Sequence, residues 1–196
     1  MEKKKILPAV IAVVLMALII VGAVGVKLYE KYSYSKETMD LSRYYGIEKE
    51  GQVPIILADV VAEEKAANID GNDYLPLSFV QEQLNSRFYY DMNEKLLLYT
   101  TALDLYEIPL DSTTYTVSGE AAEHTCPIFV LQDEVPYVSL SFMENFSNFI
   151  CNVYEAPHRL QIYTENVTHQ TAVIQKATAV RYQGGIKSDI LEQQDA

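Results

Sequence analysis

An uncharged segment near the N-terminus constrains this chain more than any other feature. Residues 6–26 contain no charged side chain, a run of 21 residues. A helix rises about 1.5 Å per residue, so about 20 apolar residues cross a hydrocarbon core that is ~30 Å thick. Lys3, Lys4 and Lys5 come just before the run, and the positive-inside rule keeps such a flank in the cytoplasm. We therefore expect a single-pass anchor in the lipid bilayer from Ile6 to Val26, with the rest of the chain outside the cytoplasm.

A cleaved signal peptide is the alternative interpretation of the same segment. Val21-Gly22-Ala23 has the small residues of a processing site. The apolar run is longer than an ordinary signal-peptide core, and this length favours the uncleaved anchor. In both cases the bulk of the chain works outside the cytoplasm. A buried core helix is disfavoured, because lysines flank the run at the extreme N-terminus.

The charge balance excludes one large class of partners. The chain has 15 basic and 27 acidic residues, a formal net charge of −12. Beyond Val26 there are 12 basic and 26 acidic residues, so the exported part carries a net charge of −14. An acidic surface repels phosphate backbones, which disfavours nucleic-acid binding. Hydrophobic residues make up 49% of the chain, enough for a packed core.

Residues 27–52 are polar and rich in tyrosine. We interpret them as a juxtamembrane stalk with one short helix at residues 36–45. Tyrosine suits the lipid headgroup layer there, because its ring is apolar and its tip is polar.

From Val53 the pattern changes to short apolar strands separated by turn residues. Asp70-Gly71 is a strong hairpin signal, since glycine tolerates positive φ. Ser78 stands three residues before Gln81, the spacing of a capping box, so we expect Ser78 to be the N-cap of a helix that ends near Asn85. The elements expected in this part are strands at 53–57, 60–69 and 74–77, the helix at 78–85, and a second hairpin formed by 88–90 and 96–99.

The same order of elements returns further along the chain. Residues 136–140 correspond to 73–77 at an offset of 63, and Ser141 opens a second capping box at the same offset. The second hairpin returns at an offset of 64, in Val153-Tyr154-Glu155 and Ile162-Tyr163-Thr164. We interpret this recurrence as an internal repeat.

A connector between the two copies holds two more expected strands, at 105–110 and 113–117, and a turn at Ser118-Gly119. The expected fold class is α+β, with two repeats of antiparallel hairpin, helix and hairpin after an N-terminal transmembrane helix. The helix residues expected in the core are Phe79, Val80 and Leu84 in the first copy, and Phe142, Met143 and Phe146 in the second.

These residues make the sequence resemble the copper amine oxidase N-terminal-like domain, a repeat of exported bacterial proteins. The resemblance rests on Gly71, the strand at 74–77, the corner Tyr89-Tyr90-Asp91 and the strand at 95–100. It covers residues 53–165, and the second copy is degenerate: it lacks a turn glycine at Asp133-Glu134. The resemblance implies a non-catalytic domain that needs no copper and no other cofactor.

The last part of the chain, residues 166–196, is interpreted as a linker followed by an incomplete domain. Residues 179–191 resemble the opening of a bacterial SH3-like domain. A complete barrel needs about five strands, and too few residues remain for them. The segment is therefore either the start of a longer domain or a flexible tail.

The combination of anchor, repeats and SH3-like start resembles the N-terminal region of membrane-anchored cell-wall proteins. Some of these continue into a chitinase-like glycoside hydrolase domain of family 18. The catalytic D-x-x-D-x-D-x-E run of that family is absent from this sequence, so no catalytic residue is carried over, and whether the chain belongs to an enzyme stays open.

Two cysteines lie in the second copy, Cys126 and Cys151. A disulfide between them persists outside the cytoplasm if their geometry allows it, and two buried thiols are the alternative. Together with His124 and His158 they would give four ligands for zinc, but the spacings are not those of structural zinc sites. We expect no metal site, and a cysteine–histidine nucleophilic pair has no support in the sequence.

Tyr89, Tyr99, Tyr137 and Tyr163 are the candidate binding residues. An aromatic ring on a free sheet face stacks on the apolar face of a sugar, whereas burial in the core is the alternative for each of them. The predicted function is a non-catalytic, membrane-anchored, extracytoplasmic module, a cell-wall-associated spacer or binding domain that contacts peptidoglycan or another wall glycan. The alternative is the N-terminal part of a family 18-like glycoside hydrolase.

Overall fold

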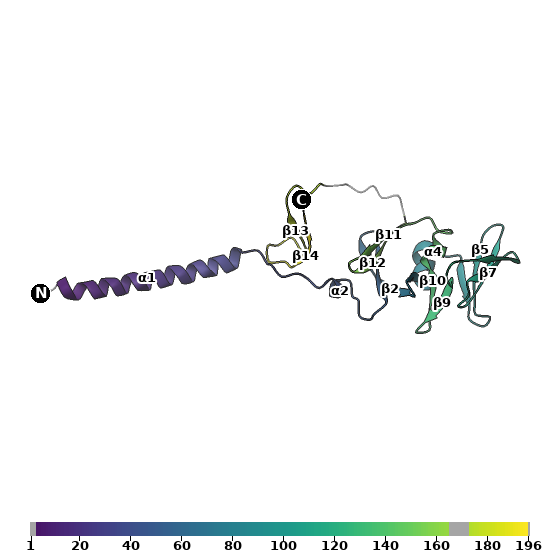
Figure 1. Ribbon diagram of the computed structural model, residues 1–196, viewed down its shortest axis with the longest axis horizontal. Coiled ribbons are helices and arrows are strands. Elements are labelled where there is room, and N and C mark those ends of the chain that lie inside the picture. Colours follow the sequence, from purple (N-terminus) through teal and green to yellow (C-terminus); the bar gives the residue numbers. More distant parts are fainter. Residues whose placement is uncertain (1–2, 165–172, 196) are drawn as a thin grey trace. The chain divides into compact units, whose positions relative to one another are not determined.

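The computed structural model describes residues 3–164 and 173–195, with side chains from Val10 onward (Figure 1). These residues form two compact units. The first unit joins the described residues up to Asp40 with those from Val173 onward, and the second begins at Leu41.

The first unit contains one long helix and one hairpin. Helix α1 (Lys3–Tyr32) is continuous over the expected anchor and extends beyond it. Strands β13 (Thr178–Arg181) and β14 (Ile190–Gln194) pair antiparallel. These residues therefore form a regular hairpin, in a segment for which a flexible tail was one of the two interpretations of the sequence.

The prediction of a short helix at residues 36–45 is wrong for most of that range. Only α2 (Leu41–Tyr44) is helical, and it belongs to the second unit. The residues before it are extended because their backbone pairs with the hairpin: Met39 N donates to Ile190 O and Ile190 N donates to Glu37 O, both at 2.8 Å.

The second unit contains two antiparallel-rich sheets. The larger has seven strands in the order β11-β12-β1-β2-β3-β10-β9, and every neighbouring pair is antiparallel except β1 with β12. The smaller has five strands in sequence order from β4 to β8, all antiparallel. The strands of the larger sheet are β1 (Gln52–Leu57), β2 (Val60–Ile69), β3 (Asn72–Pro76), β9 (Phe129–Gln132), β10 (Val135–Ser139), β11 (Ile150–Glu155) and β12 (His158–Tyr163). Those of the smaller are β4 (Phe88–Asp91), β5 (Leu96–Thr100), β6 (Leu105–Pro109), β7 (Thr114–Val117) and β8 (Glu120–Glu123).

The strand ranges and turns expected for this unit are therefore present, whereas no range was expected for β8 or β9. Two-residue turns with positive φ at both positions close four hairpins: Ala58-Asp59, Asp70-Gly71, Ser118-Gly119 and Asp133-Glu134. Positive φ at both turn residues is the geometry of the type I′ turn, which matches the twist of paired strands. The hairpin at Asp70-Gly71 is thereby confirmed, and Asp133-Glu134 makes the same turn without glycine.

The two capping boxes are wrong. Helix α3 (Leu77–Phe79) begins one residue before Ser78 and continues as the π-helical turn η1 (Val80–Leu84). Helix α4 (Leu140–Met143) likewise begins one residue before Ser141, and neither helix has a side-chain cap. Leu77 and Leu140 are buried, so core packing of the first helical residue sets the start in place of a serine hydroxyl.

One hydrophobic core joins both sheets and the helices. Phe142 of α4 lies 5.5 Å, between ring centroids, from Tyr115 of β7, and Phe146 lies 5.2 Å from Tyr99 of β5. The burial expected for the helix faces is confirmed: Phe79, Val80, Phe142 and Met143 are buried, and Leu84 and Phe146 are partly buried against the core. Helices packed on sheets agree with the α+β class.

Strands β3 and β10 are neighbours in the larger sheet, and β10 is next to the edge strand β9. Their register pairs Leu75 with Val138, which are the residues related by the offset of 63. The following hairpins differ, because β4–β5 lies in the smaller sheet and β11–β12 lies in the larger one.

Candidate functional site

Helix α1 is the clearest functional element of the first unit. Val10–Tyr32 is long and apolar enough to cross a membrane, with a mean hydropathy of 2.7, and its most apolar stretch has no buried side chain. Apolar side chains that no protein atoms cover are stable in lipid, where burial comes from the acyl chains. An N-terminal helix of this kind is compatible with an anchor and also with a signal sequence.

The C-terminal hairpin forms hydrogen bonds with the end of α1 and with the residues that follow it. Ser35 N donates to Ile186 O at 2.8 Å, and Thr38 forms a parallel bridge with Ile190. Lys187 Nζ donates to Glu30 O in the last turn of α1. The ammonium group at this position is also attracted by the partial negative charge at the C-terminal end of the helix.

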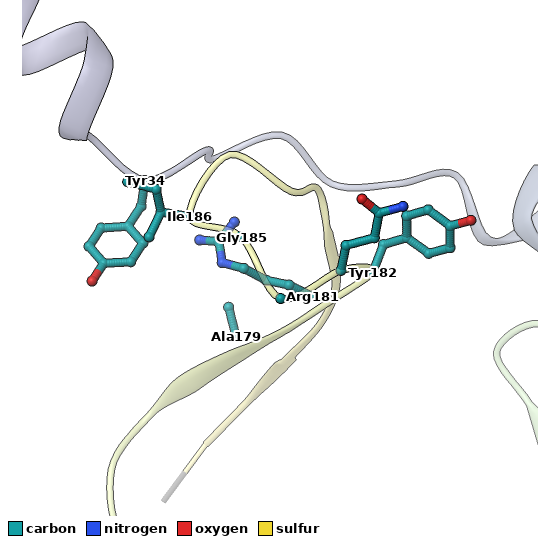
Figure 2. Close-up of a pocket in the computed structure, with 8 residues that line it drawn as sticks. Tyr34, Ala179, Arg181, Tyr182, Gly185 and Ile186 are labelled. Atoms are coloured by element: carbon teal, nitrogen blue, oxygen red, sulfur yellow. The ribbon is translucent and has the colours of Figure 1, made fainter.

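Arg181 lies at the centre of this contact. Its guanidinium donates to Ser188 O and to Ser35 O, the latter at 2.9 Å, and it lies 5.6 Å from the centre of the Tyr34 ring. Figure 2 shows Arg181 beside Ile186 and Gly185, with Tyr34 next to the end of α1 and the ring of Tyr182 pointing the other way. These side chains line an open hollow of about 400 Å³.

The four candidate tyrosines are placed very differently. Tyr99 and Tyr163 are buried, so both belong to the core. Tyr89 is 62% exposed on β4, the edge strand of the smaller sheet. Tyr137 is half-buried on β10 of the larger sheet, so the four side chains are divided between two sheets.

Tyr137 lines a hollow in the second unit. The hollow measures about 280 Å³ and is bordered by amide, charged and small apolar residues. Lys49 Nζ lies 3.5 Å from Asp133 Oδ2 at its rim. Burial, and then the charge of Asp133, raise the pKa of Tyr137, which keeps its hydroxyl neutral and able to donate a hydrogen bond. The hollow thus brings an aromatic ring together with amide and carboxylate groups.

His158 forms a polar cluster near a second hollow of about 580 Å³. Its Nε2 lies 2.8 Å from Asp73 Oδ1, and its Nδ1 lies 3.2 Å from Glu155 Oε2. Asn68 Nδ2 donates to the same Asp73 oxygen at 2.8 Å. Burial lowers the pKa of His158, but the hydrogen bond and charge of Asp73, then those of Glu155, outweigh burial and raise the pKa above its ordinary value. The cluster ties β12 to β3 across the larger sheet.

The two cysteines are both free thiols, so the structure does not contain the disulfide that the sequence allowed. Cys126 Sγ lies 3.6 Å from His124 Nδ1 and 3.5 Å from Ser139 Oγ. Cys151 lies on β11, where burial and nearby carboxylates raise its pKa to about 12. A thiol with such a pKa is a poor nucleophile at neutral pH.

The four residues considered for zinc do not form a single cluster among the described residues. His124 contacts Cys126, whereas the imidazole of His158 contacts Asp73 and Glu155. Over residues 3–164 and 173–195 no group of three or more His, Cys, Asp or Glu side chains is arranged to hold a metal ion.

Sequence reasoning missed the contacts of His158 and Arg181. His158 and Asp73 are 85 residues apart, and Arg181 and Ser35 are 146 apart. No local pattern connects residues so distant. The sequence does not show that Asp73 is the carboxyl partner of the half-buried His158, because only the assembled sheet brings the two together.

The comparisons with known proteins leave the family open. No family model matches the sequence, and neither a curated protein nor a solved structure matches it. The resemblances to the copper amine oxidase N-terminal-like domain and to the front of family 18-like glycoside hydrolases therefore stay predictions.

Proposed function

We propose that this chain is a non-catalytic module anchored in the membrane by α1, with the rest of the chain outside the cytoplasm, where it serves as a cell-wall-associated spacer or binding domain. The observation that carries the proposal is the exposed apolar surface of α1 over its membrane-length part, Val10–Tyr32. The preceding lysines set the orientation through the positive-inside rule.

Two features support a spacer rather than a reactive site. The contact of His158 with Asp73 joins strands that are 85 residues apart, and Asn68 donates to the same carboxylate from the neighbouring strand, so these polar side chains contribute to the rigidity of the sheet. The second unit is also strongly acidic, with 6 basic and 19 acidic residues between Leu41 and Thr164. Such a charge keeps a domain soluble and away from anionic surfaces.

We further propose that the second unit arose by duplication. The pairing of Leu75 with Val138 supports it, because two copies related by a local two-fold axis bring equivalent residues opposite each other. The type I′ turns at Asp70-Gly71 and Asp133-Glu134 also stand at the offset of 63. The different placement of the two following hairpins is a divergence of the copies after strands β3 and β10.

The hollow beside Tyr137 is the binding surface that we propose for a wall glycan. Tyr137 supplies the ring, and Gln52, Gln132 and Asp133 at the same hollow supply polar partners for sugar hydroxyls. A sugar stacks on the flat apolar face of an aromatic ring. A half-buried tyrosine at a hollow therefore offers a better sugar-binding surface than an isolated exposed tyrosine.

A fractionation experiment tests the anchor and its orientation. Membranes from cells that produce the full chain are extracted at alkaline pH, and intact cells are treated with protease. We expect the chain to stay in the membrane and its bulk to be digested from outside. Recovery of a soluble protein whose N-terminus follows Ala23 would establish a cleaved signal peptide, and protection of the bulk in intact cells would reverse the orientation.

A sedimentation assay with purified peptidoglycan tests the glycan surface. We expect the detergent-solubilised full chain to sediment with peptidoglycan and the Tyr137→Ala variant to lose most of this binding. Tyr89→Ala is the matched control, because Tyr89 is exposed on the other sheet and is not among the residues that line this hollow. Equal loss in both variants, or no binding by the unaltered chain, would refute a wall-binding role for Tyr137.

A further inference from the structure

We propose that the loop of the C-terminal hairpin, residues 182–187, lies against the phospholipid headgroups of the bilayer that α1 crosses. This inference rests on the proposed membrane anchor. It adds a second membrane contact, made by residues that are more than 140 positions away from α1 in the sequence.

The height of the loop follows from its bonds to α1. The uncharged run ends at Val26, and Glu30 stands four residues later, about 6 Å along the helix axis. The headgroup layer on each side of the hydrocarbon core is about 5–7 Å thick. Lys187 Nζ donates to Glu30 O, and to Ser33 Oγ at 3.3 Å, so its ammonium group is held at the level of the headgroups.

The neighbouring side chains have the chemistry of a membrane interface. Tyr34 is 67% exposed and Ile186 is 36% exposed, and Figure 2 shows them together beside the end of α1. Tyr29 and Tyr32, in the last turns of α1, are also exposed. Tyrosine is enriched at this depth because its ring enters the acyl boundary while its hydroxyl stays in water.

Lys187 in the loop and Arg181, which directly precedes it, suit lipid phosphates. An ammonium has three N–H donors and a guanidinium has five. Two donors of Lys187 and two of Arg181 are used by Glu30, Ser33, Ser35 and Ser188, which leaves donors of both side chains for phosphate oxygens. Arg181 also borders the open hollow of about 400 Å³.

The charge distribution agrees with this contact. Residues 27–40 and 173–195 together hold six basic and six acidic residues, so the exported part of the first unit is neutral. The second unit carries the excess negative charge between residues 41 and 164. Of the two, only the neutral unit approaches a phosphate-rich surface without electrostatic cost.

The absence of tryptophan from the sequence gives a clean test. The full chain is reconstituted in phosphatidylcholine nanodiscs that contain a lipid with a nitroxide on its headgroup, which quenches nearby tryptophan fluorescence. Single-tryptophan variants then report one place each. Ile186→Trp and Gly185→Trp probe the loop. A Cβ at Gly185 meets no atom within 4 Å, so the backbone there has room for a side chain to begin.

We expect both loop variants to be quenched several-fold more strongly than Leu103→Trp, a matched control at a residue of the second unit that is 90% exposed. Val13→Trp in α1, measured with lipids brominated in their acyl chains, tests the anchor separately. Quenching of Val13→Trp without quenching of the loop variants would overturn this inference and leave the anchor standing. No quenching of Val13→Trp would overturn both.

Discussion

The turn at Asp133-Glu134 offers a direct test of how backbone strain is distributed between the two halves of the second unit. Glu134 has φ of 66°, and Gly71, its counterpart at the offset of 63, has φ of 80°. A left-handed conformation costs a residue with a side chain about 1–2 kcal/mol, and glycine does not bear this cost. Glycine in turn loses about 0.4–1 kcal/mol through the greater entropy of the unfolded chain.

The two exchanges therefore have opposite signs. We expect Glu134→Gly to raise the free energy of unfolding by about 0.5–1 kcal/mol, the difference between strain relief and unfolded-state entropy. We expect Gly71→Ala to lower it by a similar amount. A Cβ at Gly71 meets nothing within 4 Å, so steric overlap adds nothing to this loss.

Urea denaturation of the full chain in detergent micelles, followed by the near-ultraviolet circular dichroism of its tyrosines, measures both changes. Glu123→Gly is the control, because Glu123 is an exposed residue of strand β8 with no positive φ. There glycine brings only its entropic cost, and we expect destabilisation of about 0.5–1 kcal/mol. A loss of stability in Glu134→Gly equal to that in Glu123→Gly would show that strain at the turn is not what distinguishes the two positions.

Three further predictions concern the core and its polar clusters. His158→Gln should lower the free energy of unfolding at about pH 5 and much less at about pH 9, as measured by urea denaturation. The reason is that the pKa of His158 is raised in the folded chain, where its protonated form pairs with Asp73. This pairing stabilises the fold fully below the unfolded pKa, and the contribution is lost as pH rises through the folded pKa. Thiol-reactive reagents at about pH 8 should label Cys151 only slowly in the folded chain and rapidly in urea, since its pKa is raised to about 12; fast labelling of the folded protein would contradict the burial. Phe142→Ala should cost about 3–5 kcal/mol, because Phe142 is 1% exposed and its ring lies 4.6 Å from that of Phe146 and 5.5 Å from that of Tyr115; a loss below about 1 kcal/mol would show that the core closes over the gap.

Local patterns in the sequence determined the elements of this protein. A run of 21 uncharged residues is sufficient to predict α1, because helix length and membrane thickness are fixed quantities. Turn residues and alternating apolar positions likewise located most strands, and Asp70-Gly71 located its hairpin, since the type I′ turn is decided by two adjacent residues. The rule failed at the helix starts, where the burial of Leu77 and Leu140 overrides the cap that Ser78 and Ser141 would provide.

The assembly of those elements was decided only by the tertiary structure. The pairing of β12 with β1 places Ile55 opposite Leu160 and joins segments about a hundred residues apart. Neither segment carries a sequence pattern that identifies the other as its partner. The same is true of His158 with Asp73 and of Arg181 with Ser35. Strand partners and polar contacts of this kind depend on which arrangement buries the most apolar surface while pairing every backbone group, and that is a property of the whole chain.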